Sequence, residues 1–178
     1  MTTDAPMGQT WIDLLYHNTA IFNEIAGNAV EEMITPKFYE DFRKQALRVL
    51  EEAQEAITAA ETKDKVECLD AAIDILVTSF GLVRQLSAVK ANVAQAAVDI
   101  SYNNLDKIFD DKYEASVVLD DMNEMEPNSP TTYFLNTHIS KGSVVGGEQC
   151  WYSIKRRADG KIMKSPTHPK VDLRSYVP

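Results

Sequence analysis

The sequence has little cysteine, no long uninterrupted apolar run and fewer basic than acidic residues. Two cysteines among 178 residues are too few for a disulfide scaffold, so we expect reduced thiols in a cytoplasmic protein. A membrane span needs about 20 consecutive apolar residues, but three acids interrupt the most apolar stretch, 66–83. Residues 1–10 lack the basic and apolar regions of a signal peptide. The net charge of -9 disfavours nucleic acid or an anionic membrane as the main partner.

The length and composition predict a single globular domain. Hydrophobic residues make up 44% of the chain, which is ordinary for a globular protein, and 178 residues can bury a core of their own. We expect one domain over 1–178, with a helical core over 10–110 and a C-terminal extension with short strands over 111–178. From residue 151 onward, seven Lys or Arg oppose two Asp. An acidic body with a basic tail suits an anionic substrate.

Periodicity and turn residues predict a mainly α fold with a small C-terminal β-hairpin. Thr35-Pro36 is a helix start signal, with an N-cap threonine followed by proline at the first helical position. Asp159-Gly160 lies between two short apolar runs and predicts a hairpin. The predicted helices are 10–26, 36–61, 65–86, 88–110 (with Ser87 as its cap) and 113–122, and the predicted strands are 133–135, 144–145, 151–156 and 161–163.

Acidic residues line one face of each of two consecutive predicted helices. Glu52 and Glu55 are three residues apart, so they share one face of the first helix. Glu67, Asp70 and Asp74 lie at i, i+3 and i+7 of the second helix, again on one face. Between Val66 and Val83 these three acids are the only charged residues, so the second helix is otherwise suited to burial.

Crowded carboxylates need a positive partner. Closely spaced carboxylates repel and raise one another's pKa, and burial strengthens the repulsion. A divalent cation relieves this conflict, and a ligand set made only of oxygen points to Mg²⁺ or Mn²⁺ rather than zinc. Three alternatives stay open: the acids of the first helix form a solvated face, the Asp residues of the second helix pair with Lys or Arg, and Glu67 acts as the capping-box partner of Asp64.

The acidic pattern resembles that of the MazG-like all-α nucleoside triphosphate pyrophosphohydrolases. Here the pattern is Glu52-x-x-Glu55, a turn, and Glu67-x-x-Asp70, with Asp74 one turn further on. The resemblance implies an all-α bundle that hydrolyses a nucleoside triphosphate to the monophosphate and pyrophosphate. It also implies that these five acids hold Mg²⁺ or Mn²⁺, with Glu52 or Glu55 as the catalytic base.

Two later segments carry the same resemblance. Asn104 and Lys107 lie in a segment similar to the Asn-x-x-Lys that such enzymes place near the substrate phosphates. The tail segment 159–166, Asp-Gly-Lys-Ile-Met-Lys-Ser-Pro, looks like the ending of many single-domain members from phages and bacteria. The resemblance implies that Asn104 and Lys107 bind the substrate with Lys161 or Lys164 in support, and that the protein works in the cytosol of a bacterium or of a phage-infected host. We favour Lys164 for this contact because it lies where the predicted strand ends.

The helices predicted to be Ala-rich or apolar lack enough chain of their own to cover every face, so we expect a homodimer or a tetramer of dimers. Two other functions stay open. Phosphoribosyl-ATP pyrophosphohydrolase shares this helical core, although such chains are usually shorter and lack the β-containing tail. A non-catalytic helical module is the other, in which the acids serve solubility or partner binding.

Overall fold

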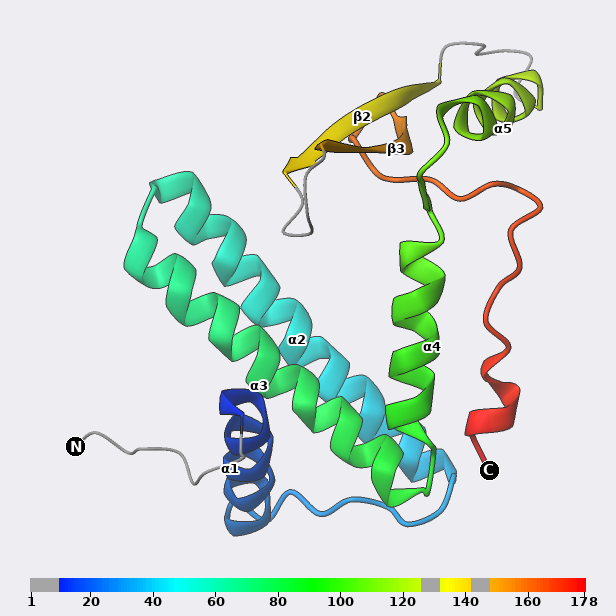
Figure 1. The fold of residues 1–178 in the computed structure, drawn as a ribbon. Helices are drawn as coiled ribbons and strands as arrows, with labels where there is room; N and C mark the ends of the chain where they lie inside the picture. The colour runs from blue at the N-terminus through cyan, green and yellow to red at the C-terminus, as the bar shows by residue number, and fades with distance from the viewer. Residues whose placement is uncertain (1–9, 126–131, 142–147) are drawn as a thin grey trace. The chain divides into compact units, whose positions relative to one another are not determined.

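The computed structural model describes residues 10–125, 132–141 and 148–178 (Figure 1). The chain divides into two compact units: residues up to Val93 together with Arg174–Pro178, and Ala94–Leu173. The fold is mainly helical with a small antiparallel sheet near the C-terminus, which confirms the predicted fold class. The single domain expected from the length stays a prediction. No helix in the described ranges has both the length and the apolar character that a membrane span requires.

The first unit is built on a long helical hairpin of α2 (Pro36–Thr62) and α3 (Lys65–Ala88), with α1 (Trp11–Ile25) packed against α3 (Figure 1). The predicted start of α2 is confirmed, because the Thr35 hydroxyl accepts a hydrogen bond from the amide of Phe38 at 3.2 Å. The helix ends at Lys63, which adopts the left-handed conformation with a φ of 58°. Asp64 then caps α3, so the hairpin turn is very short.

A glycine allows α2 and α3 to approach closely. The Nε2 of Gln45 donates to the carbonyl oxygen of Thr78 at 2.7 Å, so a side chain of α2 reaches the backbone of α3. A Cβ at Gly81 would lie 2.4 Å from that Nε2 atom. Only glycine therefore leaves room for the Gln45 side chain in this position. The rings of Tyr16 and Phe80 meet edge to face at 5.4 Å and join α1 to α3.

The second unit combines helices with a three-stranded antiparallel sheet. Its elements are α4 (Val93–Leu105), β1 (Ile108–Phe109), α5 (Lys112–Glu124), β2 (Tyr133–Lys141) and β3 (Glu148–Arg156), and the strand order is β1-β3-β2. Ile154 of β3 is fully buried and forms the core with Met122 of α5 and Tyr133 of β2. α5 therefore supplies the apolar cover for this part of the sheet.

The predicted turn at Asp159-Gly160 is confirmed. Gly160 has a φ of +70°, and the chain returns so that Lys155 and Ile162 form an antiparallel bridge. The strand predicted over 161–163 is limited to this single bridge at Ile162. The predicted strand at 144–145 lies outside the described residues.

Several boundaries differ from the sequence prediction; β2, for example, continues beyond the predicted 133–135 to Lys141, because it pairs with β3 along its whole length. Ser87 lies inside α3 rather than capping the next helix, because α3 continues to Ala88 and the chain reverses at Lys90, whose φ is 63°. The helix predicted over 88–110 is shorter, since α4 ends at Leu105. Ile108 and Phe109 instead form β1 by pairing with Ser153 and Tyr152. That pairing depends on β3, which lies more than 40 residues later.

Candidate functional site

The hairpin of α2 and α3 brings acids from both helices together. Glu52 on α2 is half-buried. Its partial burial, and then repulsion from Glu55, Asp74 and other nearby acids, raise the pKa of the Glu52 carboxyl above its ordinary value. Asp70 also contributes to this repulsion, so carboxylates from both helices act on Glu52. The acids that the sequence pattern places on one face of each helix therefore make the surroundings of Glu52 acidic.

Glu67 lies closer to the turn, at the third position of α3. Asp64 caps the helix by accepting the amides of Val66 at 2.9 Å and Glu67 at 3.2 Å. A full capping box would also use the Asp64 amide as a donor to Glu67, but that amide donates to the oxygen of Ala59 at 3.0 Å. The cap therefore does not require the Glu67 carboxylate.

The chemistry of the acidic group suits a hard divalent cation. The candidate ligands are carboxylate oxygens, and their mutual repulsion would fall if a positive charge lay among them. Within the described ranges, no three Asp, Glu, His or Cys side chains are gathered closely enough to hold a metal ion. A cation would therefore have to draw the side chains of Glu52, Glu55, Glu67, Asp70 and Asp74 inward, and the metal assignment stays a prediction.

The three predicted substrate-binding residues belong to the second unit. Asn104 is exposed and Lys107 is partly buried, both near the end of α4. Lys164 donates its Nζ to the Oδ1 of Asn103, the residue next to Asn104. The Asn103 amide nitrogen also donates to the oxygen of Pro169 at 3.0 Å and lies 2.9 Å from the Nε2 of His168. Hydrogen bonds of Asn103 therefore connect the tail to α4. The substrate-binding roles of Asn104, Lys107 and Lys164 stay predictions.

A polar cavity of about 300 Å³ is present in the first unit. The end of α1, the segment that follows it, α2 and α3 all contribute to its wall. Four cationic side chains line it, Lys37, Lys44, Arg48 and Arg84, against one lining carboxylate, Asp41. No sequence pattern predicts this cavity; the one local signal is Arg84, the first basic residue of α3 after Lys65.

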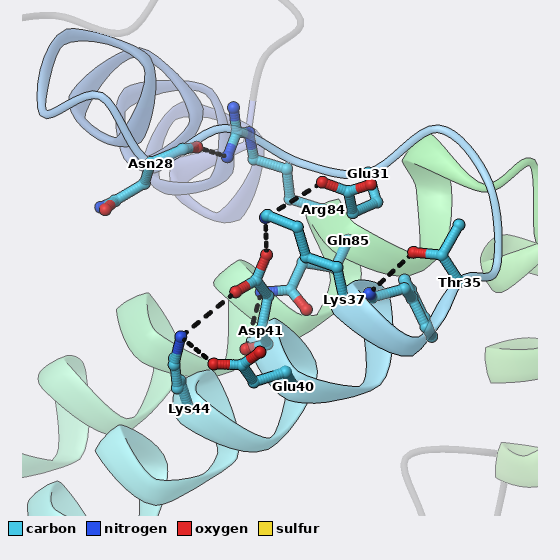
Figure 2. Close-up of polar contacts among 10 residues, drawn as sticks. Asn28, Glu31, Thr35, Lys37, Glu40, Asp41, Lys44, Arg84 and Gln85 are labelled. Carbon is cyan, nitrogen blue, oxygen red and sulfur yellow. Dashed lines mark hydrogen bonds and ion pairs between the residues drawn. The ribbon is translucent and has the colours of Figure 1, made fainter.

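The lysines of this cavity are neutralised by nearby acids, as Figure 2 shows. Lys37 bridges Glu31 at 3.0 Å and Asp41 at 2.5 Å, and Lys44 pairs with Glu40 at 2.7 Å. The hydrogen bonds that Lys37 donates to Asp41 and then to Glu31 raise the pKa of Lys37, and the bond to Asp41 also lowers the pKa of the Asp41 carboxyl. The two lysines therefore present little net charge to the cavity.

The arginines of the cavity have neutral partners. The Nη1 of Arg84 donates to the carbonyl oxygen of Asn28 at 2.9 Å, and the Nη1 of Arg48 donates to the Oε1 of Gln45 at 3.2 Å. Among the residues that the structure describes, neither guanidinium lies within ion-pair distance of a carboxylate. Positive charge in this cavity is thus concentrated on Arg48 and Arg84.

The comparison with protein families gives one match. Residues 19–87 match the family model of phosphoribosyl-ATP pyrophosphohydrolase. That family belongs to the MazG-like all-α superfamily, so the resemblance seen in the acidic motifs is supported at that coarser level. No curated protein and no solved structure matches the chain. The family match covers less than half of the chain, and it spans all five candidate metal ligands and the polar cavity but none of the second unit. Over residues 19–87 the chain is therefore similar to the phosphoribosyl-ATP pyrophosphohydrolases.

Proposed function

We propose that this chain is a pyrophosphohydrolase that cleaves a phosphoric anhydride of a nucleotide. The observation that carries the proposal is the convergence of acids from α2 and α3. Burial is the larger cause of the raised pKa of Glu52, and repulsion from these acids is the next. The family match over the same helices supports the same reaction class. In this reaction a water oxygen attacks the α-phosphorus, and the bond from that phosphorus to the pyrophosphate leaving group breaks.

Glu52 is our candidate for the base that accepts the proton from this water. Its partial burial, the larger cause of its raised pKa, favours Glu52 as the carboxylate that accepts this proton. Glu55, Glu67, Asp70 and Asp74 would hold Mg²⁺ or Mn²⁺, with Glu52 as a further ligand. When bound, this cation would neutralise phosphate charge in the ground state and in the transition state.

Two substrates fit this proposal. The acidic motifs and the tail fit a nucleoside triphosphate, which would yield the monophosphate and pyrophosphate. The family match favours phosphoribosyl-ATP as a second candidate, because the matched family carries that name. Asn104, Lys107 and Lys164 are proposed to bind phosphate groups of either substrate.

A homodimer or a tetramer of dimers is part of the proposal. Large apolar side chains remain exposed on both helices of the hairpin: Leu50 is 63% exposed, Ile57 is 51% exposed and Leu69 is 66% exposed. A second copy could bury these side chains and extend the bundle.

The test of the function is product analysis on a nucleotide panel. The panel contains nucleoside triphosphates, deoxynucleoside triphosphates and phosphoribosyl-ATP, each with Mg²⁺ or Mn²⁺. Phosphorus NMR should show pyrophosphate and a nucleoside monophosphate product from at least one of them. Release of orthophosphate alone, or no turnover of any nucleotide, would contradict the proposal.

A further inference from the structure

The second unit contains a largely apolar pocket of about 630 Å³ on its three-stranded sheet. Ile154 of β3 forms a core with Met122 of α5, and successive residues of a strand point to opposite faces of the sheet. Ser153 and Lys155, on either side of Ile154, therefore face away from α5, and both line the pocket. The pocket volume is within the usual range for small-molecule sites.

Three different side chains follow one another along the pocket side of β3. They are the indole of Trp151, the hydroxyl of Ser153 and the ammonium group of Lys155. The strand covers about 13 Å from Trp151 to Lys155, at about 3.3 Å per residue. A ligand that contacts both ends of this row needs a flat apolar part for the indole and a separate charged part for the ammonium group.

Strand β2 adds polar side chains to the row. Asn136 lies opposite Ser153, and His138 lies opposite Trp151. Within the described ranges, neither the Asn136 amide nor the Ser153 hydroxyl makes a side-chain hydrogen bond to another residue. Both groups can therefore bind polar atoms in the middle of a ligand.

The opposite side of the pocket is apolar. Ile108 of β1 pairs with Ser153, and Ile162 of the tail forms a bridge with Lys155. Leu105, at the end of α4, also lines the pocket and is 63% exposed. A ligand with an apolar body would remove this surface from water.

The charge of the pocket decides which ligand fits it. Among the described residues that line it, Lys155 is the only Lys, Arg, Asp or Glu. Lys155 is partly buried, and no carboxylate of a described residue lies within ion-pair distance of it. An ammonium group in apolar surroundings favours an anionic partner. One ammonium group matches one carboxylate and would leave most of the charge of a triphosphate without a partner.

We propose that this pocket binds a small aromatic carboxylate. The ring packs against Trp151, and the carboxylate accepts a hydrogen bond from Lys155. Asn136 and Ser153 bind polar atoms between the two ends. Every residue of the site belongs to the second unit, so the proposal does not depend on the acidic group of α2 and α3 or on the proposed hydrolysis.

The test is calorimetric titration with naphthaleneacetate, with naphthaleneacetamide, which has the same ring and no charge, and with acetate, which has no ring. Naphthaleneacetate should bind more tightly than either of the other two, because only it contacts both Trp151 and Lys155. Lys155→Met should weaken binding of naphthaleneacetate by roughly tenfold and leave that of the amide unchanged. Trp151→Leu should weaken binding of both aromatic compounds. If Trp151→Leu does not fold, the difference between acid and amide in wild type and Lys155→Met still decides the outcome.

Lys112→Met is the matched control, because it removes the same charge from an exposed position of the second unit outside the pocket. It should leave the affinity unchanged. The proposal is overturned if naphthaleneacetate does not bind at millimolar concentration, if it binds no better than the amide, or if the control weakens it as much as Lys155→Met. It is also overturned if adenosine monophosphate binds more tightly than naphthaleneacetate and loses affinity in Lys155→Met, since the pocket would then belong to the nucleotide site. Because no hydrolysis is measured, failure of this proposal is distinct from failure of the proposed enzymatic function.

Discussion

Glu52 on α2 and Asp74 on α3 lie close enough for their carboxylates to repel one another. Burial is the larger cause that raises the pKa of Glu52, and the repulsion from Glu55 and Asp74 adds to it. Carboxylates on the two packed helices α2 and α3 therefore repel one another. A divalent cation bound among these carboxylates would relieve the repulsion.

Glu52→Gln should stabilise the metal-free protein. The substitution keeps the shape of the side chain and removes a carboxylate whose charged form is disfavoured in the folded state. We expect the melting temperature at neutral pH, with a chelator present, to rise by roughly 1–3 °C. Glu51→Gln, at the exposed neighbouring position, should raise it less. A fall in the melting temperature of Glu52→Gln would show that the Glu52 carboxylate stabilises the hairpin.

Gly81→Ala should destabilise the hairpin by displacing Gln45. The added Cβ would lie 2.4 Å from the Gln45 Nε2, so the amide would lose its bond to Thr78. We expect a loss of about 1–2 kcal/mol in the free energy of unfolding, measured with denaturant.

The double variant separates this clash from other effects. In a Gln45→Ala background the clash is absent, and alanine is the better helix former. Gly81→Ala should then be neutral or stabilising by up to about 1 kcal/mol. An equal loss in both backgrounds would mean that the Gln45 contact is not the reason for glycine at this position.

Asp159→Asn should lower stability at neutral pH and not at acid pH. The hydrogen bond from Arg156, then that from the Lys161 amide, lower the pKa of Asp159 from 3.8 to about 2. A lowered folded-state pKa means that the carboxylate stabilises the fold above the unfolded value of 3.8 and loses this effect as the pH falls through about 2.

The measurement is the melting temperature of wild type and Asp159→Asn across this pH range. The difference should shrink as the pH falls below 3.8, be small near 2 and vanish only below that value. In an Arg156→Met background the difference at neutral pH should be smaller, because the guanidinium partner is gone. A difference that does not change with pH would contradict the ion pair.

The apolar faces of the hairpin predict self-association. Light scattering at micromolar concentration should give at least twice the chain mass of 19.9 kDa. Leu69→Glu should favour the monomer, because it places a charge on a side chain that is 66% exposed in the single chain and would be buried by a second copy. A wild-type mass near 19.9 kDa would exclude the proposed dimer under these conditions.

Local signals in the sequence predicted most of the helical framework. The cap at Thr35 and the turn at Asp159-Gly160 depend on neighbouring residues, and both are present in the structure. The short turn also predicted that the acidic helices pack side by side, and carboxylates of α3 do act on Glu52, while the metal site itself stays a prediction.

Features that depend on distant residues escaped prediction. β1 exists because Ile108 and Phe109 pair with β3, and a two-residue strand has no periodicity to detect. The polar cavity depends on Arg84 reaching the Asn28 carbonyl, 56 residues away in the sequence. Local spacing does not distinguish Asn103, which contacts the tail, from Asn104, because the contact depends on which face of α4 meets the tail.

Metal-dependent release of pyrophosphate tests the central claim most directly. The measurement is phosphorus NMR of the nucleotide panel with wild type, Glu55→Gln, Asp70→Asn and the control Glu51→Gln, each with Mg²⁺ and with chelator. We predict pyrophosphate from wild type and from the control only when Mg²⁺ is present. Glu55→Gln and Asp70→Asn should lower turnover by at least roughly tenfold while keeping the folded state. Turnover near the wild-type rate in both acid variants, or pyrophosphate release unaffected by the chelator, would contradict the account.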